Sequence, residues 1–155
     1  FFAIYIFVVI KVIVFKYPYE ELRQIAVSWQ KGDVLQGLGT ANFMPFKTIK
    51  MYIEYAHKLN SVENLAGNVL VFVPFGFLFP FAARDGERFF VMLLNAFVFV
   101  LGIETFQLFS AFGAFDVDDI LLNCLGAALG FFAYRLMCVR NLKRKPKVTD
   151  INDRI

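Results

Sequence analysis

Side chains capable of chemistry occur at spaced positions within a sequence that is otherwise strongly apolar. They carry carboxyl or carboxamide groups and lie at Asn64, Asn68, Glu104, Gln107, Asp116, Asp118, Asp119 and Asn123. Such groups can bind a polar head group, exchange a proton with a substrate or, as oxygen ligands, hold a hard divalent cation. Several are three or four residues apart, which places them on one side of a helix.

The composition predicts that these groups belong to a membrane protein. Of 155 residues, 59% are hydrophobic and 19% are charged, whereas soluble domains are roughly 45–50% apolar and about 25% charged. The apolar residues form blocks near the length of about 20 residues that crosses a bilayer. A freely secreted domain is therefore excluded. The two cysteines, Cys124 and Cys138, lie in one apolar block, roughly 21 Å apart along a helix and too far apart to form a disulfide within it.

Four apolar blocks predict four transmembrane helices. They cover residues 1 to about 17, 64–83, 89 to about 109, and about 117–137. No small-residue cleavage site follows the first block, which we interpret as a retained span rather than a signal peptide. The predicted fold is an all-α membrane protein with a single transmembrane domain over residues 1–140. Residues 141–155 are predicted to be a basic, flexible cytoplasmic tail.

Basic residues predict the orientation of the spans. Lys and Arg are concentrated after the fourth block, and the connection at residues 84–88 carries two arginines, whereas the connection at residues 110–116 has none. The positive-inside rule then places both termini and residues 84–88 in the cytoplasm. Residues 18–63 and 110–116 are expected outside the plasma membrane.

The outer segment between the first two spans contains predicted amphipathic helices. From residue 45, apolar side chains recur at helical spacing, and the charged or polar residues Lys47, Lys50 and His57 follow the same rhythm on another face. This pattern is typical of a short helix in the membrane interface, where Lys47 and Lys50 can contact an anionic head group. His57 is interpreted as a solvated residue. A weaker pattern over residues 19–31, which includes Trp29, predicts a second such helix.

On this topology the polar side chains share a depth just below the outer surface. An ionisable group inside a span costs at least about 2.5–3.5 kcal/mol near the bilayer centre, so it usually faces the bundle interior. Lys11 of the first span lies at a similar level and is predicted to make a direct or water-bridged contact with Glu104 or Asp119. Gly126 and Gly130 continue the polar stripe of the fourth span and are expected to let another helix approach closely.

Two interpretations of the polar residues are open. Asp116 and Asp118 can cap the fourth span, because Asp is a favoured N-cap residue and acidic groups in the first turn offset the helix dipole. Glu104, Asp119 and Asn123 lie further into the hydrocarbon region, where they either bind a ligand or join helices through hydrogen bonds.

Several blocks of the sequence resemble a known family. NFMPF at residues 42–46, GNVLVFVPFG at 67–76, Glu104 followed by Gln107, and DVDDILLNCLG at 116–126 have the order and spacing of VanZ-like membrane proteins. The resemblance covers about residues 42–134. The family is named for an accessory protein that gives Gram-positive bacteria low-level resistance to teicoplanin, so the resemblance implies a phenotype rather than a defined reaction.

Motif residues can be carried over from this resemblance by position. They are Asn42, Pro45, Phe46, Asn68, Pro74, Gly76, Pro80, Glu104, Gln107, Asp116, Asp119, Asn123 and Gly126. Two positions depart from the expected pattern. Gly113 and Ala114 stand where an Arg is common, and Gly102 stands where a Ser often precedes the Ile-Glu pair. The missing Arg would be a partner for the aspartates or for a phosphate.

Three functions are compatible with these features. The first is a cell-envelope protein that binds a membrane lipid or a lipid-linked envelope precursor and confers lipoglycopeptide resistance. Its candidate ligand-binding residues are Asn42, Asn64, Asn68, Glu104, Gln107, Asp116, Asp118, Asp119 and Asn123. The second is a metal-dependent enzyme acting on a lipid phosphate, with Asp116, Asp118 and Asp119 as metal ligands and Glu104 as base. The third is a structural membrane subunit.

The first hypothesis requires no cofactor and no metal. The sequence identifies no catalytic residue and no oligomeric state. We expect no nucleic-acid partner, because a basic tail beside a transmembrane helix is an orientation and anionic-lipid signal.

Overall fold

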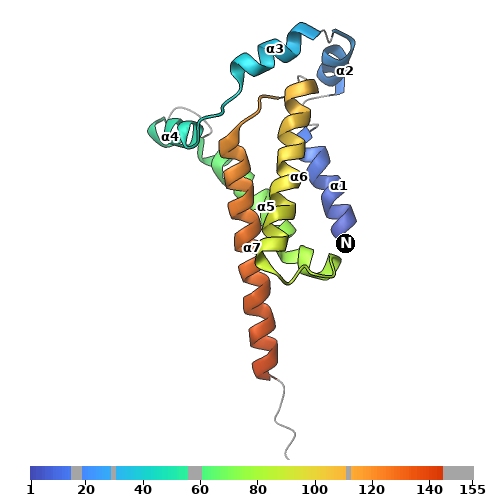
Figure 1. Ribbon diagram of the computed structural model, residues 1–155, viewed down its shortest axis with the longest axis vertical. Coiled ribbons are helices and arrows are strands. Elements are labelled where there is room, and N and C mark those ends of the chain that lie inside the picture. The colour runs from blue at the N-terminus through green and yellow to red at the C-terminus, as the bar shows by residue number, and fades with distance from the viewer. Residues whose placement is uncertain (15–18, 29–30, 56–60, 111–112, 145–155) are drawn as a thin grey trace, which may run out of the picture.

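The computed structural model describes residues 1–14, 19–28, 31–55, 61–110 and 113–144. These residues form seven helices (Figure 1), namely α1 (Phe2–Val14), α2 (Tyr19–Ser28), α3 (Lys31–Thr40), α4 (Lys47–Glu54), α5 (Ser61–Ala82), α6 (Phe89–Ser110) and α7 (Val117–Arg144). The described ranges contain no strand, although an isolated parallel β-bridge pairs Asn42 with Asp116. The predicted all-α fold is confirmed.

Three helices are long and apolar enough to cross a membrane. In the described part of the chain they are Val62–Ala82 of α5, Phe89–Ser110 of α6 and Val117–Arg140 of α7, close to the predicted second, third and fourth spans. Helix α1 has 13 residues, or about 20 Å at 1.5 Å per residue, whereas the hydrocarbon core is about 30 Å thick. The prediction of four spans is therefore confirmed for three, and the first block is described as a shorter apolar helix.

Helix α7 has an apolar outer face of the kind that contacts lipid. A stripe at helical spacing is 39–67% exposed and consists of Leu121, Leu125, Leu129, Phe132 and Leu136. The opposite side carries the buried residues Ala127 and Phe131. A soluble bundle would place polar residues on the exposed stripe. The exposed apolar stripe, together with the three long apolar helices, indicates an integral membrane protein.

Glycines bring α5 and α7 into backbone contact. A Cβ atom at Gly126 or Gly130 would collide with the carbonyl oxygen of Val69 or Val73, respectively. Gly76 makes the reciprocal contact from α5 onto the backbone of α7. Small residues permit this approach, and packing between helices then takes the place of a hydrophobic driving force that lipid does not supply. The predicted role of Gly126 and Gly130 is confirmed.

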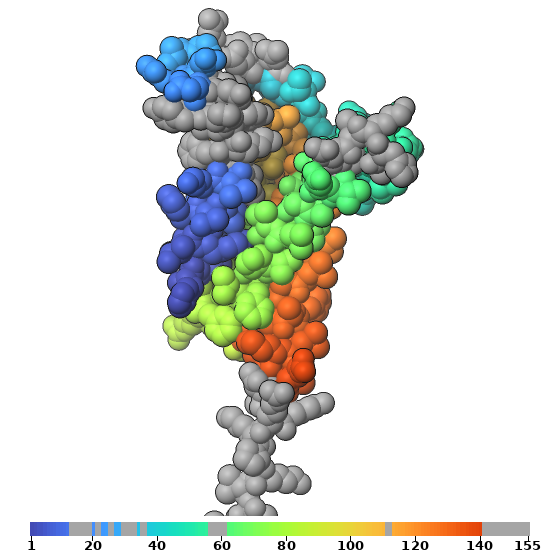
Figure 2. Space-filling view, turned by 180° about the vertical axis from the view of Figure 1, so that it is seen from behind, coloured from blue at the N-terminus to red at the C-terminus, as the bar shows by residue number. Residues whose placement is uncertain are grey.

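Helix α1 packs beside α5, and Figure 2 shows α5 lying between α1 and α7. The hydroxyl of Tyr5 donates a hydrogen bond to the carbonyl oxygen of Val71, at 2.7 Å. Pro74, which follows in α5, has no N–H group and disturbs the hydrogen bonds of this turn. The ring of Phe2 also packs against that of Phe75, with centroids 5.4 Å apart. A neighbouring helix thus supports the proline-containing turn.

Different helices and connections lie at the two ends of the bundle. Helices α2, α3 and α4 and the connection before α7 lie at one end (Figure 1). The start of α1, the turn between α5 and α6, and the last turns of α7 lie toward the other. Segments predicted to lie on opposite sides of the membrane are therefore at opposite ends. Helix α7 continues to Arg144, four residues into the predicted tail, and residues 145–155 lie outside the described residues.

The segment between α1 and α5 contains one helix more than predicted. The helix expected from residue 45 is α4, and the weaker pattern corresponds to α2, whereas Trp29 and His57 lie outside the described residues. Helix α3 was not predicted, because a glycine costs about 1 kcal/mol in a helix relative to alanine and this segment contains Gly32, Gly37 and Gly39. Gly37 lies against the carbonyl of Leu108 in α6, where a Cβ atom would be 3.3 Å away. Tertiary packing therefore offsets the low propensity.

Candidate functional site: a clamp and a polar cavity

Asp118 caps a helix other than its own. Its carboxylate is fully buried and accepts the backbone N–H groups of Phe46, Thr48 at 2.7 Å and Ile49 at 3.1 Å. These donors belong to the start of α4 and have no partner within that helix. The N-cap residue Phe46 provides no side-chain cap. The carboxylate of α7 therefore stabilises the N-terminus of α4, where a negative charge is favoured by the helix dipole.

Asp116 caps its own helix and also binds two residues of the outer segment. Its Oδ1 accepts the backbone N–H of Asp118 and the side-chain amide of Asn42, both at 2.8 Å. Its Oδ2 accepts the hydroxyl of Thr48 at 2.6 Å. The backbone of Asn42 pairs with Phe115 and Val117 on either side. We call Asn42, Thr48, Asp116 and Asp118 the clamp, because together they fasten the start of α4 to the start of α7.

Asp119 follows the clamp in sequence but faces α5. Its carboxylate accepts a hydrogen bond from the side-chain amide of Asn68. Its backbone carbonyl accepts the side-chain amide of Asn123 at 2.7 Å. Successive residues of a helix point in directions about 100° apart. Asp118 and Asp119 therefore have different partners.

Glu104 lies between the two groups. It is 3% exposed, and its Oε2 accepts the backbone N–H of Asp116 at 3.0 Å. Gln107, one turn further along α6, is also buried and lies against Gly113, where a Cβ atom would be 3.1 Å from the side-chain Cδ of Gln107. As predicted from their spacing, Glu104 and Gln107 are on the same side of α6.

Six of the nine candidate residues line one polar cavity of about 350 Å³. They are Asn64, Asn68, Glu104, Gln107, Asp119 and Asn123. The rest of its wall consists of Val12, Tyr52, Glu63, Gly67, Val71 and Ala114. Helices α1, α4, α5, α6 and α7 all contribute. We call this space the polar cavity. Asn42, Asp116 and Asp118 belong to the clamp and are not part of this wall.

One buried acceptor in the polar cavity has no hydrogen-bond partner. Asn123 is 3% exposed, and its Oδ1 is without a donor among the residues the structure describes. The orientation of the amide is fixed, because its nitrogen donates to the carbonyl of Asp119. A buried polar atom left unpaired costs about 1–3 kcal/mol. It therefore indicates a position where a ligand or water can donate.

The lysines predicted to act with this cluster lie elsewhere. Lys47 and Lys50 are exposed on α4 and do not line the polar cavity. Lys50 forms an exposed ion pair with Glu54, at 3.8 Å. Lys11 is exposed and makes no direct ion pair with a described residue, whereas the adjacent Val12 lines the cavity. The direct contact predicted between Lys11 and Glu104 or Asp119 is therefore absent, because the side chain lies on the outer surface of α1.

The three aspartates do not form a common oxygen cluster. Asp116 and Asp118 are saturated by donors of the clamp, and Asp119 is bonded to Asn68 on the opposite side. In the described ranges, no group of three or more His, Cys, Asp or Glu side chains is placed to hold a metal ion. The arrangement required by the metal-enzyme hypothesis is not present in these residues.

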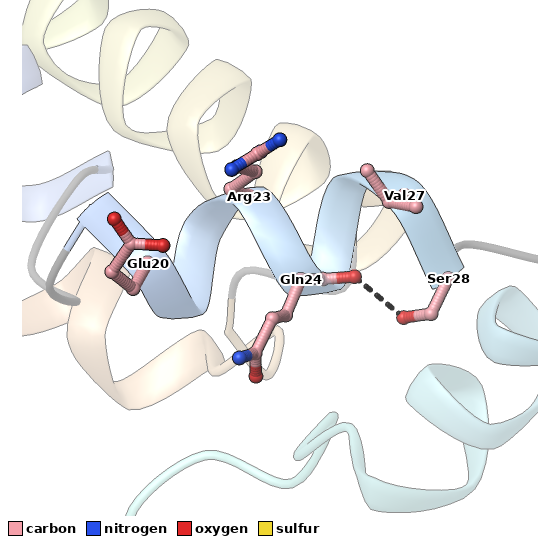
Figure 3. Close-up of a pocket in the computed structure, with 5 residues that line it drawn as sticks. All are labelled: Glu20, Arg23, Gln24, Val27 and Ser28. Carbon is pink, nitrogen blue, oxygen red and sulfur yellow. Dashed lines mark hydrogen bonds between the residues drawn. The ribbon is translucent and has the colours of Figure 1, made fainter.

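A second cavity, of about 570 Å³, has a different character (Figure 3). Its described lining comes from α2 alone and comprises Glu20, Arg23, Gln24, Val27 and Ser28. The labelled side chains point in several directions around the helix, and Ser28 donates to the backbone carbonyl of Gln24 at 2.7 Å. These groups do not converge on a common point.

A family comparison covers nearly the whole chain. The sequence profile that defines the VanZ/LLP1 family matches residues 2–138. The chain belongs to the VanZ/LLP1 family. The resemblance inferred from the motifs is thereby confirmed. Neither a curated protein nor a solved structure matches the chain.

The VanZ-like motif residues occur in three parts of the structure. Asn42 and Asp116 belong to the clamp, Asn68 and Asn123 line the polar cavity, and Gly76 supports contact between α5 and α7. The two departures from the family pattern, at residues 113–114 and at Gly102, lie in different surroundings. Ala114 is part of the cavity wall, so an Arg there would bring a cation to it, whereas a Cβ atom at Gly102 would meet nothing within 4 Å.

Sequence reasoning missed several residues of the site. Thr48 resembles an ordinary surface residue of an amphipathic helix, and no local pattern reveals its bond to Asp116. Val12 and Tyr52 reach the cavity through tertiary packing alone. Glu63 was detectable, since it precedes Asn64 and is four residues from Gly67 on the same side of α5.

Proposed function

We propose that this VanZ-family protein binds the polar head group of a membrane lipid or lipid-linked envelope precursor in the polar cavity. In this proposal, binding alters the access of lipoglycopeptides to the envelope and confers resistance of the teicoplanin type. The observation that carries the proposal is the cavity wall, where the buried acceptor Asn123 Oδ1 lacks a donor among the described residues. A purely structural cluster would be expected to pair its buried polar groups.

The lining of the polar cavity suits an amphipathic ligand. Carboxyl and carboxamide groups from α5, α6 and α7 face the same space as the apolar side chains of Val12 and Val71. Binding sites for small molecules commonly combine an apolar wall with a few polar groups that fix orientation. Lys47 and Lys50, exposed on the same helix as Tyr52 of the wall, are proposed to contact an anionic part of the lipid outside the cavity.

We further propose that residues 1–140 form one domain of the bacterial plasma membrane, with the polar cavity near the outer surface and both termini in the cytoplasm. This can be tested by cysteine labelling in intact cells after both native cysteines are replaced by alanine. Gly39→Cys on α3 should react with a membrane-impermeant maleimide, and Asp85→Cys between α5 and α6 should not. Both positions are exposed. The reverse pattern would invert the orientation.

Resistance tests the function of the cavity. Glu104→Gln and Asn123→Ala, expressed in a teicoplanin-sensitive Gram-positive host, should lower the inhibitory concentration to that of the untransformed host, with unchanged protein in the membrane. Glu104→Gln keeps the shape of the side chain and an acceptor oxygen but removes its charge, so it should not impair packing.

Asn95→Ala is the matched control. Asn95 lies exposed on α6 and donates to the carbonyl four residues earlier at 2.8 Å, just as Asn123 does at 2.7 Å. It should retain full resistance. If Glu104→Gln and Asn123→Ala also retain it, the cluster serves to join helices, and the structural-subunit hypothesis replaces this one.

A further inference from the structure

Asn95 places a carboxamide on the outer surface of a membrane-spanning helix. It belongs to α6, which runs from Phe89 to Ser110, and its side chain is exposed. The middle of this helix lies between residues 99 and 100, so Asn95 is only about 7 Å from it along the axis, inside a hydrocarbon core about 30 Å thick. A polar group at this depth is expected to face another protein helix rather than lipid.

The hydrogen bonds of the Asn95 side chain are only partly formed. Its amide nitrogen donates to the carbonyl oxygen of Val91 at 2.8 Å. A carboxamide has two N–H donors and one acceptor oxygen, and within the described part of the chain the second N–H and Oδ1 make no hydrogen bond. The hydrocarbon core holds no water to replace them. The remaining donor and acceptor therefore call for a partner that can both accept and donate.

A regular row of residues runs through Asn95 along α6. Val91, Asn95, Val98, Gly102 and Thr105 follow one another at intervals of four, three, four and three residues, which is the spacing of the contact positions in a coiled coil. The middle three are exposed, and the outer two are half-buried. Figure 1 shows α6 on the near side of the bundle, in front of α5. We call these five residues the α6 seam.

Gly102 leaves room for a second helix at the α6 seam. A Cβ atom there would meet nothing within 4 Å. At Gly126 and Gly130, by contrast, a Cβ atom would collide with the backbone of α5, so those glycines serve a contact within the chain. A glycine lowers the helix propensity of α6, and no described neighbour makes use of the space at Gly102. Small residues are typical of surfaces where transmembrane helices approach closely.

The symmetry of a membrane protein indicates what this partner is. Two copies lie the same way up in the bilayer, so a two-fold axis along the membrane normal makes their α6 helices parallel. Each residue of the α6 seam then meets its own counterpart. A carboxamide is complementary to itself, because each of two Asn95 side chains can donate to the oxygen of the other. A single Asn in such a row also fixes the register of a helix pair.

We propose that two copies of this chain associate through the α6 seam, with their Asn95 side chains hydrogen-bonded across the two-fold axis and their backbones in close contact at Gly102. The seam is separate from the polar cavity. Glu104 follows Asn95 by nine residues, which is about 180° round the helix, and it is buried toward the bundle. No seam residue occurs in the described lining of the cavity. The inference therefore goes beyond the proposed function and does not depend on it.

Disulfide cross-linking in membranes tests which face of α6 meets the second copy. In the full-length protein with both native cysteines replaced by alanine, Val98→Cys should form a covalent dimer on oxidation with copper phenanthroline. Phe97→Cys is the matched control, because Phe97 is also exposed on α6 but lies about 160° round the helix from Asn95. It should remain monomeric. Equal cross-linking at the two positions would indicate random collision and overturn the inference.

Two substitutions weaken the α6 seam without disturbing the fold of one chain. Energy transfer between labelled copies of the full-length protein, at increasing ratios of detergent to protein, measures the dissociation constant. Gly102→Leu fills open space in the single chain and should raise that constant by about a hundredfold or more, with unchanged unfolding in SDS. Asn95→Ala removes the reciprocal hydrogen bonds and should raise it by about tenfold. Gly39→Leu on α3, another position where a Cβ atom meets nothing within 4 Å, should leave it unchanged.

The outcomes separate this inference from the proposed function. A wild-type dissociation constant in Gly102→Leu would overturn the inference, and so would a Val98→Cys product in which the second chain is a different protein. If Gly102→Leu fails to insert, the comparison of Val98→Cys with Phe97→Cys still decides. Asn95→Ala should weaken association yet retain resistance. Full resistance in the cavity variants would overturn the proposed function and leave the dimer standing.

Discussion

The clamp and the polar cavity are built from the same kinds of residue at the same end of the bundle, yet they differ in how these residues are satisfied. In the clamp, both oxygens of Asp116 and both of Asp118 accept hydrogen bonds from the protein. In the polar cavity, the buried Oδ1 of Asn123 has no described partner. Saturated groups hold a structure together, whereas an acceptor left without a donor indicates a place for a ligand.

The boundary between the two regions passes between adjacent residues. Asp118 is fully buried and directed to α4, and Asp119 is directed to Asn68 of α5. Glu104 connects the regions, since it lines the cavity and accepts the N–H of Asp116. The clamp therefore positions the wall of the cavity through α6 and the start of α7. Substitutions in the clamp should mainly lower stability, whereas substitutions in the polar cavity should mainly impair ligand binding.

The largest effect should come from Asp118→Ala. The change leaves three backbone N–H groups at the start of α4 without their acceptor, and it should lower the free energy of unfolding by about 2–4 kcal/mol. Unfolding by increasing SDS in mixed micelles measures this. Asp85→Ala is the control, because its exposed pair with Arg88, at 3.5 Å, contributes at most about 1 kcal/mol. A loss no greater than that of the control would show that the carboxylate does not hold α4.

Much of the fold could be predicted from the sequence because hydropathy and helical periodicity are local signals. They identified α5, α6 and α7, and the recurrence of Gly126 and Gly130 predicted that another helix packs closely against α7, which proved to be α5. Helix α3 could not be predicted, since its glycines disfavour a helix and its packing against α6, which includes Gly37, is a tertiary contact. Helix α1 is described from Phe2 to Val14, and the end of the apolar block, predicted at about residue 17, lies outside the described residues.

The polar residues of the site were identifiable, but their division into two regions was not. Spacing placed Glu104 with Gln107, and both line the cavity. The alternative that Asp116 and Asp118 act as caps was visible in the sequence, and Asp116 does cap α7. No local pattern could show that Asp118 caps α4, because that bond joins residues about 70 positions apart. Tertiary contacts, not propensity, separate a capping aspartate from one that lines the cavity.

The smallest effect on stability, and the sharpest test of the comparison, is expected from a pair of amide substitutions. In Asp116→Asn, the remaining oxygen can still accept from Asn42 and from the N–H of Asp118, and the new amide can donate to Thr48. Asn caps a helix about as well as Asp. The free energy of unfolding should change by less than about 1 kcal/mol, and resistance should remain.

Asp119→Asn makes the same chemical change three residues further along the chain, in the wall of the polar cavity. The amide oxygen can still accept from Asn68, and removal of a charge from the bundle lowers the cost of burial, so stability should be unchanged or slightly higher. Resistance should nevertheless be lost, because the carboxylate that the cavity wall presents to the proposed ligand is gone. Unfolding in SDS and inhibitory concentrations together distinguish the two variants. If Asp116→Asn abolishes binding while Asp119→Asn preserves it, the clamp is the ligand site and the cavity is its support.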